Sequence, residues 1–231
     1  MNIKGILKTS LVDYPGRLTT VIFLGGCNLE CRYCHNPELI CGTSKSDDLN
    51  EVDILELIKK RSSLVDSVVI TGGEPTISKE IISFLQKIKD IPLSAKLDTN
   101  GSNPVIIEEL LEKKLVDYVA VDIKTSPEKY QLVTGKDVDF NTIKNTIDII
   151  KKSGIDYELR TTCIPHFVTL DDFKKIKNEV GKIKKYYLQQ FVNKVTLDSA
   201  LKDYNPYPVS VLNEFMLFVK TFADVCEIRG I

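Results

Sequence analysis

Short runs of β-branched residues alternate with amphipathic helical stretches along the chain from residue 19 to residue 191. Each strand-like run and the helix-like run that follows it span roughly 30 residues, which is typical of a β-α-β unit. The strand-like runs occupy residues 19–24, 67–75, 94–101, 117–124, 156–165 and 184–191. Because parallel strands need a long crossover that is usually a helix, this order predicts a parallel sheet covered by helices.

Six such units are fewer than the eight of a complete TIM barrel. We therefore expect an α/β fold, an incomplete (β/α)6 TIM-type barrel with parallel strands in a single domain, and keep an open doubly wound sheet as the alternative. Residues 1–18 are expected to form a strand and a turn, and residues 19–191 the (β/α)6 core. Residues 192–231 are expected to form a C-terminal extension, with a helix over 208–224 and a short strand at 226–230.

Polar residues gather directly after each predicted strand. In barrels and in doubly wound sheets, the carboxyl ends of the strands carry the functional site. The polar clusters lie at residues 27–34, 71–75, 98–101, 122–124, 160–163 and 189–191. We expect these six segments to converge at one edge of the sheet and to build one site there.

The charge balance and the apolar pattern exclude several classes of protein. The 231 residues include 31 basic and 32 acidic side chains, so no basic excess indicates nucleic-acid binding. No apolar run reaches the roughly 20 residues of a membrane span, and residues 1–16 lack the apolar core of a signal peptide. We expect a cytoplasmic protein, a compartment in which six cysteines favour metal binding or redox chemistry over disulfides.

Three cysteines, Cys27, Cys31 and Cys34, lie within eight residues. A structural zinc site would need a fourth ligand, from His35 or Cys41, and usually uses two separated ligand pairs. An iron-sulfur cluster held by four cysteines would be a closed electron carrier, whereas three would leave one iron open to a substrate or cofactor. We interpret Cys41 as a buried apolar residue instead of a ligand.

Two further cysteines, Cys163 and Cys226, stand in apolar strand contexts. Free cysteine is among the most buried residue types and usually packs as a small apolar side chain. We interpret both as core residues.

The cysteine motif, with Tyr33 directly before the third cysteine, resembles the signature of the radical S-adenosylmethionine (SAM) enzymes. The segment GGEP at residues 72–75 resembles their amino-group-binding motif. Residues 10–16 (SLVDYPG), 23–28 (FLGGCN), 34–38 (CHNPE), 98–101 (DTNG) and 122–124 (DIK) are similar to the glycyl-radical-enzyme activases. Within that subgroup, the chain is most similar to activating proteins of anaerobic ribonucleoside-triphosphate reductases.

The resemblance implies a [4Fe-4S] cluster on Cys27, Cys31 and Cys34, whose open iron binds the amino and carboxylate groups of SAM. Reductive cleavage of SAM then gives a 5'-deoxyadenosyl radical, which takes the α-hydrogen of a glycine in a partner enzyme. The implied partner is a glycyl-radical enzyme, the large subunit of anaerobic ribonucleotide reductase. The implied electron donor is a flavodoxin or a ferredoxin.

Charge and position then predict the residues that contact SAM. Glu74 would place a negative charge near the SAM ammonium, and Lys124 would pair with its carboxylate. Asp13, in the turn before the first core strand, is a candidate substrate contact. The expected SAM-binding residues are Tyr33, Gly72, Gly73, Glu74, Pro75, Asn100, Asp122, Lys124, Arg160 and Thr162.

Asp98 and Asp122 end two neighbouring predicted strands. Two such carboxylates repel unless one is protonated or a cation lies between them. This predicts a candidate cation site at Asp98 and Asp122, with pairing to Lys124 as the alternative.

Three other functions remain open from the sequence. One is a radical SAM enzyme that acts on a small molecule, similar to 7-carboxy-7-deazaguanine synthase, and another is a pyruvate formate-lyase-type activase. The third is a non-catalytic iron-sulfur or zinc module. The turn at residues 13–16 and the run at residues 34–37 favour an activase.

Overall fold

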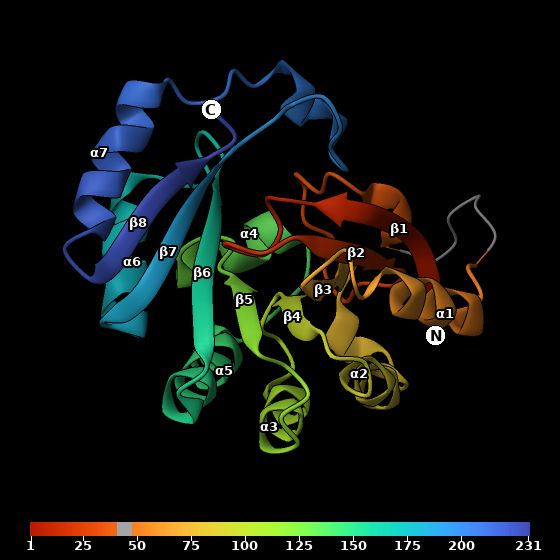
Figure 1. The fold of residues 1–231 in the computed structure, drawn as a ribbon. Coiled ribbons are helices and arrows are strands. Elements are labelled where there is room, and N and C mark those ends of the chain that lie inside the picture. The colour runs from red at the N-terminus through yellow and green to blue at the C-terminus, as the bar shows by residue number, and fades with distance from the viewer. Residues whose placement is uncertain (41–47) are drawn as a thin grey trace.

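The computed structural model describes residues 1–40 and 48–231, which form a curved eight-stranded sheet in chain order (Figure 1). The strands are β1 (Ile3–Ser10), β2 (Thr19–Leu24), β3 (Ser67–Gly72), β4 (Ser94–Thr99), β5 (Tyr118–Asp122), β6 (Asp156–Cys163), β7 (Ile183–Gln190) and β8 (Ala223–Arg229). Strand β1 is antiparallel to β2, and all pairs from β2 to β8 are parallel. The strand order places β1 and β8 at the two ends of the sheet.

Helices follow the parallel strands, and Figure 1 shows α2, α3, α5 and α6 on the outer side of the curved sheet. The helices are α1 (Glu51–Arg61), α2 (Ile81–Lys89), α3 (Pro104–Glu112), α4 (Tyr130–Thr134), α5 (Phe140–Ser153), α6 (Leu170–Val180) and α7 (Val209–Val219). Short 3-10 turns are η1 (Pro37–Leu39), η2 (Pro75–Ile77), η3 (Pro127–Lys129) and η4 (Ser199–Asp203).

Helix α5 shows how the sequence builds this layer. The Asp139 side chain accepts a hydrogen bond from the Asn141 backbone at the start of the helix, and Gly154, at φ 78°, ends it. Ile143, Ile147 and Ile150 recur at helical spacing and are fully buried. Each such side chain contributes about 1.5–3 kcal/mol on burial, which is enough to fix the helix against the sheet.

The structure confirms the incomplete parallel barrel in a single α/β domain, with the six predicted strands appearing as β2 to β7. A seventh parallel strand, β8, extends the sheet, and it starts at Ala223, inside the segment that the sequence assigns to a helix. Helix α7 ends at Val219, and the buried Phe222 and Ala223 continue into the pairing of Ala223 with Ile183 of β7. Phe222 and Ala223 could also extend the helix, but they are buried beside β7 instead, and the strand begins at Ala223.

Within residues 1–40 and 48–231, no helix is both long and apolar enough to cross a membrane.

Candidate functional site

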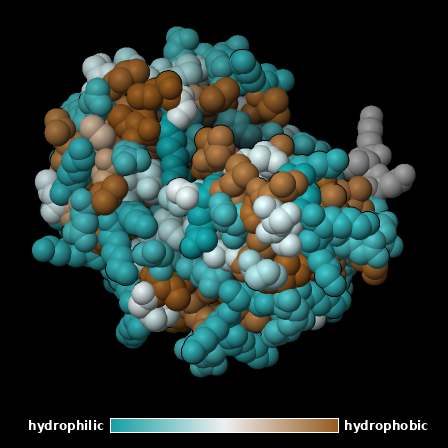
Figure 2. All heavy atoms as spheres, in the orientation of Figure 1, coloured by the Kyte–Doolittle hydropathy of each residue, from teal (hydrophilic) through white to brown (hydrophobic). Residues whose placement is uncertain are grey.

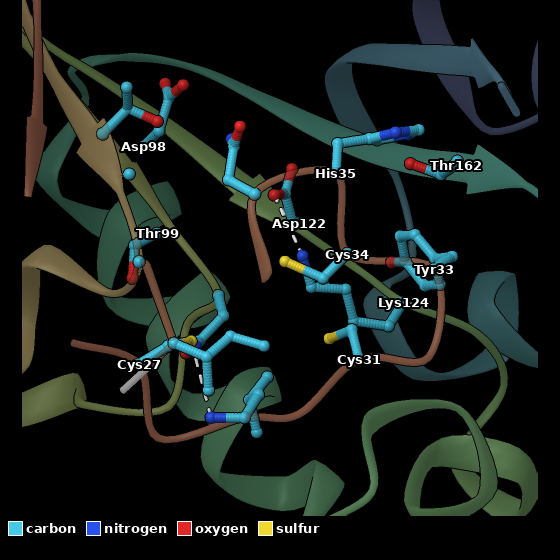
Figure 3. Close-up of a pocket in the computed structure, with 17 residues that line it drawn as sticks. Cys27, Cys31, Tyr33, Cys34, His35, Asp98, Thr99, Asp122, Lys124 and Thr162 are labelled. Atoms are coloured by element: carbon cyan, nitrogen blue, oxygen red, sulfur yellow. Dashed lines mark hydrogen bonds and ion pairs between the residues drawn. The ribbon is translucent and has the colours of Figure 1, made fainter. Parts of the chain in front are cut away.

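A cavity of about 230 Å³ opens at the carboxyl ends of strands β2 to β6 (Figure 3). Five of the six predicted polar clusters contribute to its lining, so the expected convergence is observed for them. The lining residues are Cys27, Leu29, Cys31, Tyr33, Cys34, His35, Asn36, Ile40, Thr71, Gly72, Gly73, Asp98, Thr99, Asn100, Asp122, Lys124 and Thr162.

The loop that carries the three cysteines is held by backbone hydrogen bonds to two other segments. The Glu30 amide donates to the Thr134 carbonyl at 2.8 Å, and the Arg32 amide donates to the Val133 carbonyl at 3.0 Å, both in α4. From the C-terminal side, the Asp198 amide donates to the Arg32 carbonyl at 2.8 Å, and the Arg32 side chain forms an ion pair with the Asp198 carboxylate. The loop is therefore positioned by its neighbours as well as by β2.

The side chains of Cys27, Cys31 and Cys34 line the same cavity, close to Lys124 (Figure 3). Burial raises the pKa of all three thiols, that of Cys31 to about 12, although the charge of Lys124 opposes the shift. The metal-free thiols therefore hold their protons at neutral pH, and metal binding would release them.

No group of three or more Cys, His, Asp or Glu side chains among residues 1–40 and 48–231 is arranged to hold a single metal ion. A cubane cluster does not require such a point of convergence, because each of its thiolate ligands binds a different iron. Cys41, the predicted non-ligand, lies outside the described residues. Cys163 and Cys226 are buried, as expected for core residues.

Gly72 and Gly73 pack directly against the base of the cysteine loop. A Cβ at Gly73 would lie 1.9 Å from the Gly26 carbonyl oxygen, and a Cβ at Gly72 would lie 2.4 Å from backbone atoms of Leu24. The Gly73 amide donates to the Leu24 carbonyl, and the Glu74 amide donates to the Gly26 carbonyl, both at 2.8 Å. The absence of side chains therefore lets the turn after β3 hold the start of the cysteine loop.

The Glu74 carboxylate points into the protein and does not line the cavity. It accepts hydrogen bonds from the amide and hydroxyl of Thr76, the hydroxyl of Thr99 and the amide of Asn100, at 2.6–3.1 Å. Its side chain is buried, and burial raises its pKa against the effect of these bonds. Pro75 occupies the first turn of η2 beside it. In this structure the carboxylate joins the end of β3 to the end of β4.

Arg160 supplies the positive charge between the two carboxylates that the sequence predicts to repel. Its Nε lies 2.7 Å from Asp122 Oδ1, and its Nη1 lies 3.0 Å from Asp98 Oδ2. Lys124 Nζ lies 3.1 Å from the other oxygen of Asp122. Burial alone raises the pKa of both acids, but nearby cations outweigh it and hold both pKa values below the usual range. These cations are Arg160 and Lys96 for Asp98, and Arg160 and Lys124 for Asp122. The repulsion between Asp98 and Asp122, from which the sequence predicts a candidate cation site, is thus relieved by the Arg160 side chain.

Several predicted SAM contacts share the first cavity, and others lie elsewhere. Tyr33, Gly72, Gly73, Asn100, Asp122, Lys124 and Thr162 line it, whereas Glu74, Pro75 and Arg160 do not. Arg160 and Asp13 instead line a second cavity of about 570 Å³, together with Val12, Gln189, Arg229 and Gly230. Arg160 thus belongs to the wall between the two cavities.

A comparison with protein families identifies the chain. The model of the radical SAM superfamily matches residues 21–212, from β2 into α7. The chain belongs to the radical SAM superfamily. It is 35% identical, over 99% of its length and 96% of the relative, to a Methanocaldococcus jannaschii protein provisionally named as a glycyl-radical enzyme activating enzyme. It is 29% identical, over 79% of its length and 77% of the relative, to the pyruvate formate-lyase-activating enzyme of Clostridium pasteurianum.

The fold agrees with that of a solved structure that holds S-adenosylmethionine. The crystal structure of Streptococcus suis SuiB bound to S-adenosylmethionine superposes with a TM-score of 0.67 at 16% identity. The match covers 88% of this chain, which spans only 48% of the SuiB chain. Membership of the superfamily implies a [4Fe-4S] cluster and SAM as cofactors. The first cavity, called the radical SAM site below, fits these two cofactors. Its three thiols border open space, and Lys124 lies at its edge.

Sequence reasoning missed three charged residues beneath the radical SAM site. Lys96 and Glu158 are fully buried, and Arg229 contacts Glu158 at 3.0 and 3.2 Å. The available signal was the alternate-residue spacing, since Lys96 and Glu158 each stand two residues before a site residue, Asp98 and Arg160, and so face the same side of their strands.

Proposed function

We propose that this radical SAM enzyme activates a glycyl-radical enzyme. The observation that carries the proposal is the 35% identity to the M. jannaschii relative, which extends over 99% of this chain and 96% of the relative. This similarity extends beyond residues 21–212, which the superfamily model matches. The similarity to the C. pasteurianum activating enzyme supports the same reaction class.

In this proposal, Cys27, Cys31 and Cys34 hold the cluster, and SAM occupies the rest of the first cavity. When bound, the reduced cluster and SAM supply the one-electron chemistry that removes a hydrogen atom from the substrate. Lys124 and Asn100 line this cavity, and in the proposal the Lys124 ammonium and the Asn100 side-chain amide bind a carboxylate or a hydroxyl of the cofactor. Tyr33 and Leu29, both buried, exclude water from the cluster side of the cavity.

The second cavity supplies a route for a polypeptide. It lies between the turn after β1 and the ends of β7 and β8, which are at opposite ends of the sheet order. Figure 2 shows that this face of the molecule is hollowed between the β7–β8 side and the β1 side. Asp13, Gln189 and Arg229 offer hydrogen-bonding groups to a main chain. A glycine suits such a route because it has no side chain to block the approach.

We further propose that the partner is the large subunit of an anaerobic ribonucleoside-triphosphate reductase and that a flavodoxin or ferredoxin supplies the electron in the cytoplasm. The support is the resemblance of the chain to activating proteins of that reductase, within the glycyl-radical-enzyme activases that residues 10–16 and 34–38 resemble. A pyruvate formate-lyase-type partner is the competing assignment. Because the chain is similar to the C. pasteurianum activating enzyme, the test includes this partner as well.

The experiment is an anaerobic activation assay. The cluster is reconstituted, reduced and mixed with SAM, and 5'-deoxyadenosine is measured with each of the two candidate partners and with neither. We expect formation of 5'-deoxyadenosine to rise with the reductase together with a glycyl radical signal. The absence of both products with every partner, under conditions that reduce the cluster, would overturn the proposal.

A further inference from the structure

Lys96 is a fully buried lysine in the middle of β4, with no exposed side-chain surface. Its ammonium group has three hydrogens to donate, and three oxygen atoms surround it. Nζ lies 2.5 Å from the Asp13 carbonyl oxygen, 3.0 Å from Asp98 Oδ1 and 3.6 Å from Glu158 Oε1. Burying a lysine costs free energy because its charge is removed from water. The three contacts offset this cost.

The contacts of Lys96 join the walls of the two cavities. Asp98 lines the first cavity, and Asp13 lines the second. The contact to Asp13 is made to its backbone carbonyl, so it fixes the course of the chain there and does not depend on the aspartate side chain. The Asp13 side chain accepts instead from the Ser10 hydroxyl within the same turn.

From Lys96, charges of alternating sign continue across the site. Asp98 contacts Arg160, Arg160 contacts Asp122, and Asp122 contacts Lys124 at the edge of the first cavity. Each step is an ion pair of 2.7–3.1 Å between side chains of β4, β5, β6 and the loop after β5. The turn that contains Asp13 is therefore connected through Lys96 to the residues that face SAM in the proposed function.

We propose that Lys96 is a positioning residue that sets the substrate-side turn, residues 11–17, relative to the cofactor cavity. This inference rests on the proposed function, in which the second cavity admits the glycine to be activated. A hydrogen atom moves between two carbon atoms only when they are held close together, and a displacement of the substrate-side wall by about 1 Å can cost up to about a hundredfold in rate. Lys96 would therefore act on the efficiency of transfer and not on the cleavage of SAM.

The test compares Lys96→Met with Lys129→Met in the reconstituted enzyme. Lys129 also pairs with a buried aspartate, Asp172, at 2.7 Å, but lies outside both cavities. The decisive quantity is the number of glycyl radicals formed per 5'-deoxyadenosine released with the reductase. A general loss of folded enzyme lowers both amounts together and leaves this ratio unchanged. We expect Lys96→Met to lower the ratio by roughly tenfold or more and Lys129→Met to leave it at the wild-type value.

A second readout uses hydrogen–deuterium exchange of the metal-free protein. Residues 11–17 contain local bonds such as that from the Arg17 amide to the Tyr14 carbonyl, at 3.1 Å. We expect faster exchange of this segment in Lys96→Met and not in Lys129→Met. If wild-type enzyme formed no glycyl radical with any partner, the proposed function would fail, and this exchange measurement would still decide whether Lys96 anchors the turn.

Charge balance is the competing explanation, and a double variant separates it from anchoring. Lys96→Met together with Glu158→Gln removes one charge of each sign but does not restore the bond to Asp13. We expect its ratio to remain low. A wild-type ratio in either variant, or unchanged exchange of residues 11–17 in Lys96→Met, would overturn the inference. Should Lys96→Met not fold, Lys96→Leu, which also lacks a donor, replaces it with the same expected results.

Discussion

The Nε of Arg160 lies 2.7 Å from Asp122 Oδ1, across the neighbouring ends of β5 and β6. The same guanidinium reaches Asp98 on β4 at 3.0 Å and Glu158 on β6 at 3.8 Å, so one arginine pairs with three carboxylates. A guanidinium has five donors in a fixed plane, which suits it to this bridging position. The negative charges of Asp98 and Asp122 are consequently balanced by a side chain of the protein itself.

Replacing Arg160 with methionine would leave Asp98 and Asp122 without their shared partner. Breaking a buried ion pair by removing one member costs about 3–5 kcal/mol, and we expect a loss of this size in the free energy of unfolding at neutral pH. Urea unfolding of the metal-free protein measures it. Lys113→Met, which removes an exposed pair with Glu109, should cost no more than about 0.5 kcal/mol.

The same carboxylates predict how this loss depends on pH. The pKa of Asp122 is lower in the folded protein than its usual 3.8, so its ion pair contributes stability above that pH. The contribution disappears as the pH falls through the folded pKa. The difference in stability between wild type and Arg160→Met should therefore shrink below pH 3.8. A difference that stays constant into acid would contradict the assignment of the pair.

Glu74 is expected to act on the structure of the site without any cofactor bound. Glutamine at this position has a single acceptor oxygen for four donors, and leaving buried donors unpaired costs about 1–3 kcal/mol. We expect Glu74→Gln to lose that much stability in the metal-free protein. The control is Glu80→Gln, whose exposed carboxylate accepts from Ser78, and which should change stability by less than about 0.5 kcal/mol. Equal stabilities for Glu74→Gln and wild type would instead favour a direct role of its charge toward SAM.

A side chain at Gly73 should displace the cysteine loop. Its Cβ would overlap the Gly26 carbonyl oxygen at 1.9 Å, and that oxygen belongs to backbone that cannot rotate away. We expect Gly73→Ala to lose about 1–3 kcal/mol of stability and to bind less iron on reconstitution. Gly5→Ala is the matched control, because its nearest neighbour would lie at an ordinary 3.7 Å. Iron content equal to that of Gly5→Ala would rule out this packing role.

The cluster ligands can be separated from the other cysteines by single substitutions. Cys31→Ala should lose the cluster, because three thiols already leave one iron without a protein ligand. Cys41→Ala and Cys163→Ala should keep it, and iron and sulfide analysis after reconstitution measures the result. Loss of the cluster in Cys41→Ala would mean a fourth protein ligand and would favour an electron carrier.

Much of the fold could be predicted from the sequence because its signals are local. The alternation of strand-like and helix-like runs predicted β2 to β7, and the position of polar residues after the strands predicted where the cavity lies. The seventh parallel strand was missed in part, since Phe222 and Ala223 suit a helix as well as a strand. Only the pairing of Ala223 with Ile183, distant in sequence, decides between them.

The motifs predicted which residues gather at the site but not which way they point. Glu74 reads as a ligand-binding acid in the sequence, yet it binds four donors of the protein. Arg160 was expected to contact SAM, and Asp98 and Asp122 were expected to form a candidate cation site, with pairing to Lys124 as the alternative. In the structure Arg160 pairs with both aspartates, and Lys124 pairs with Asp122. The solution depends on three strands meeting side by side, which no spacing along the chain reveals. Lys96 was missed although its position two residues before Asp98 places it on the same side of β4.

In the proposed function, a glycine of a partner enzyme loses its α-hydrogen atom to the 5'-deoxyadenosyl radical made from SAM, which gives 5'-deoxyadenosine and a glycyl radical. The most direct measurement uses anaerobic ribonucleoside-triphosphate reductase labelled with α-deuterated glycine, together with the reconstituted and reduced enzyme and unlabelled SAM. Mass spectrometry of the 5'-deoxyadenosine then reports the source of the hydrogen. We expect deuterium in the product along with a glycyl radical in the reductase. Product without deuterium, formed at the same rate with and without the reductase, would contradict the claim.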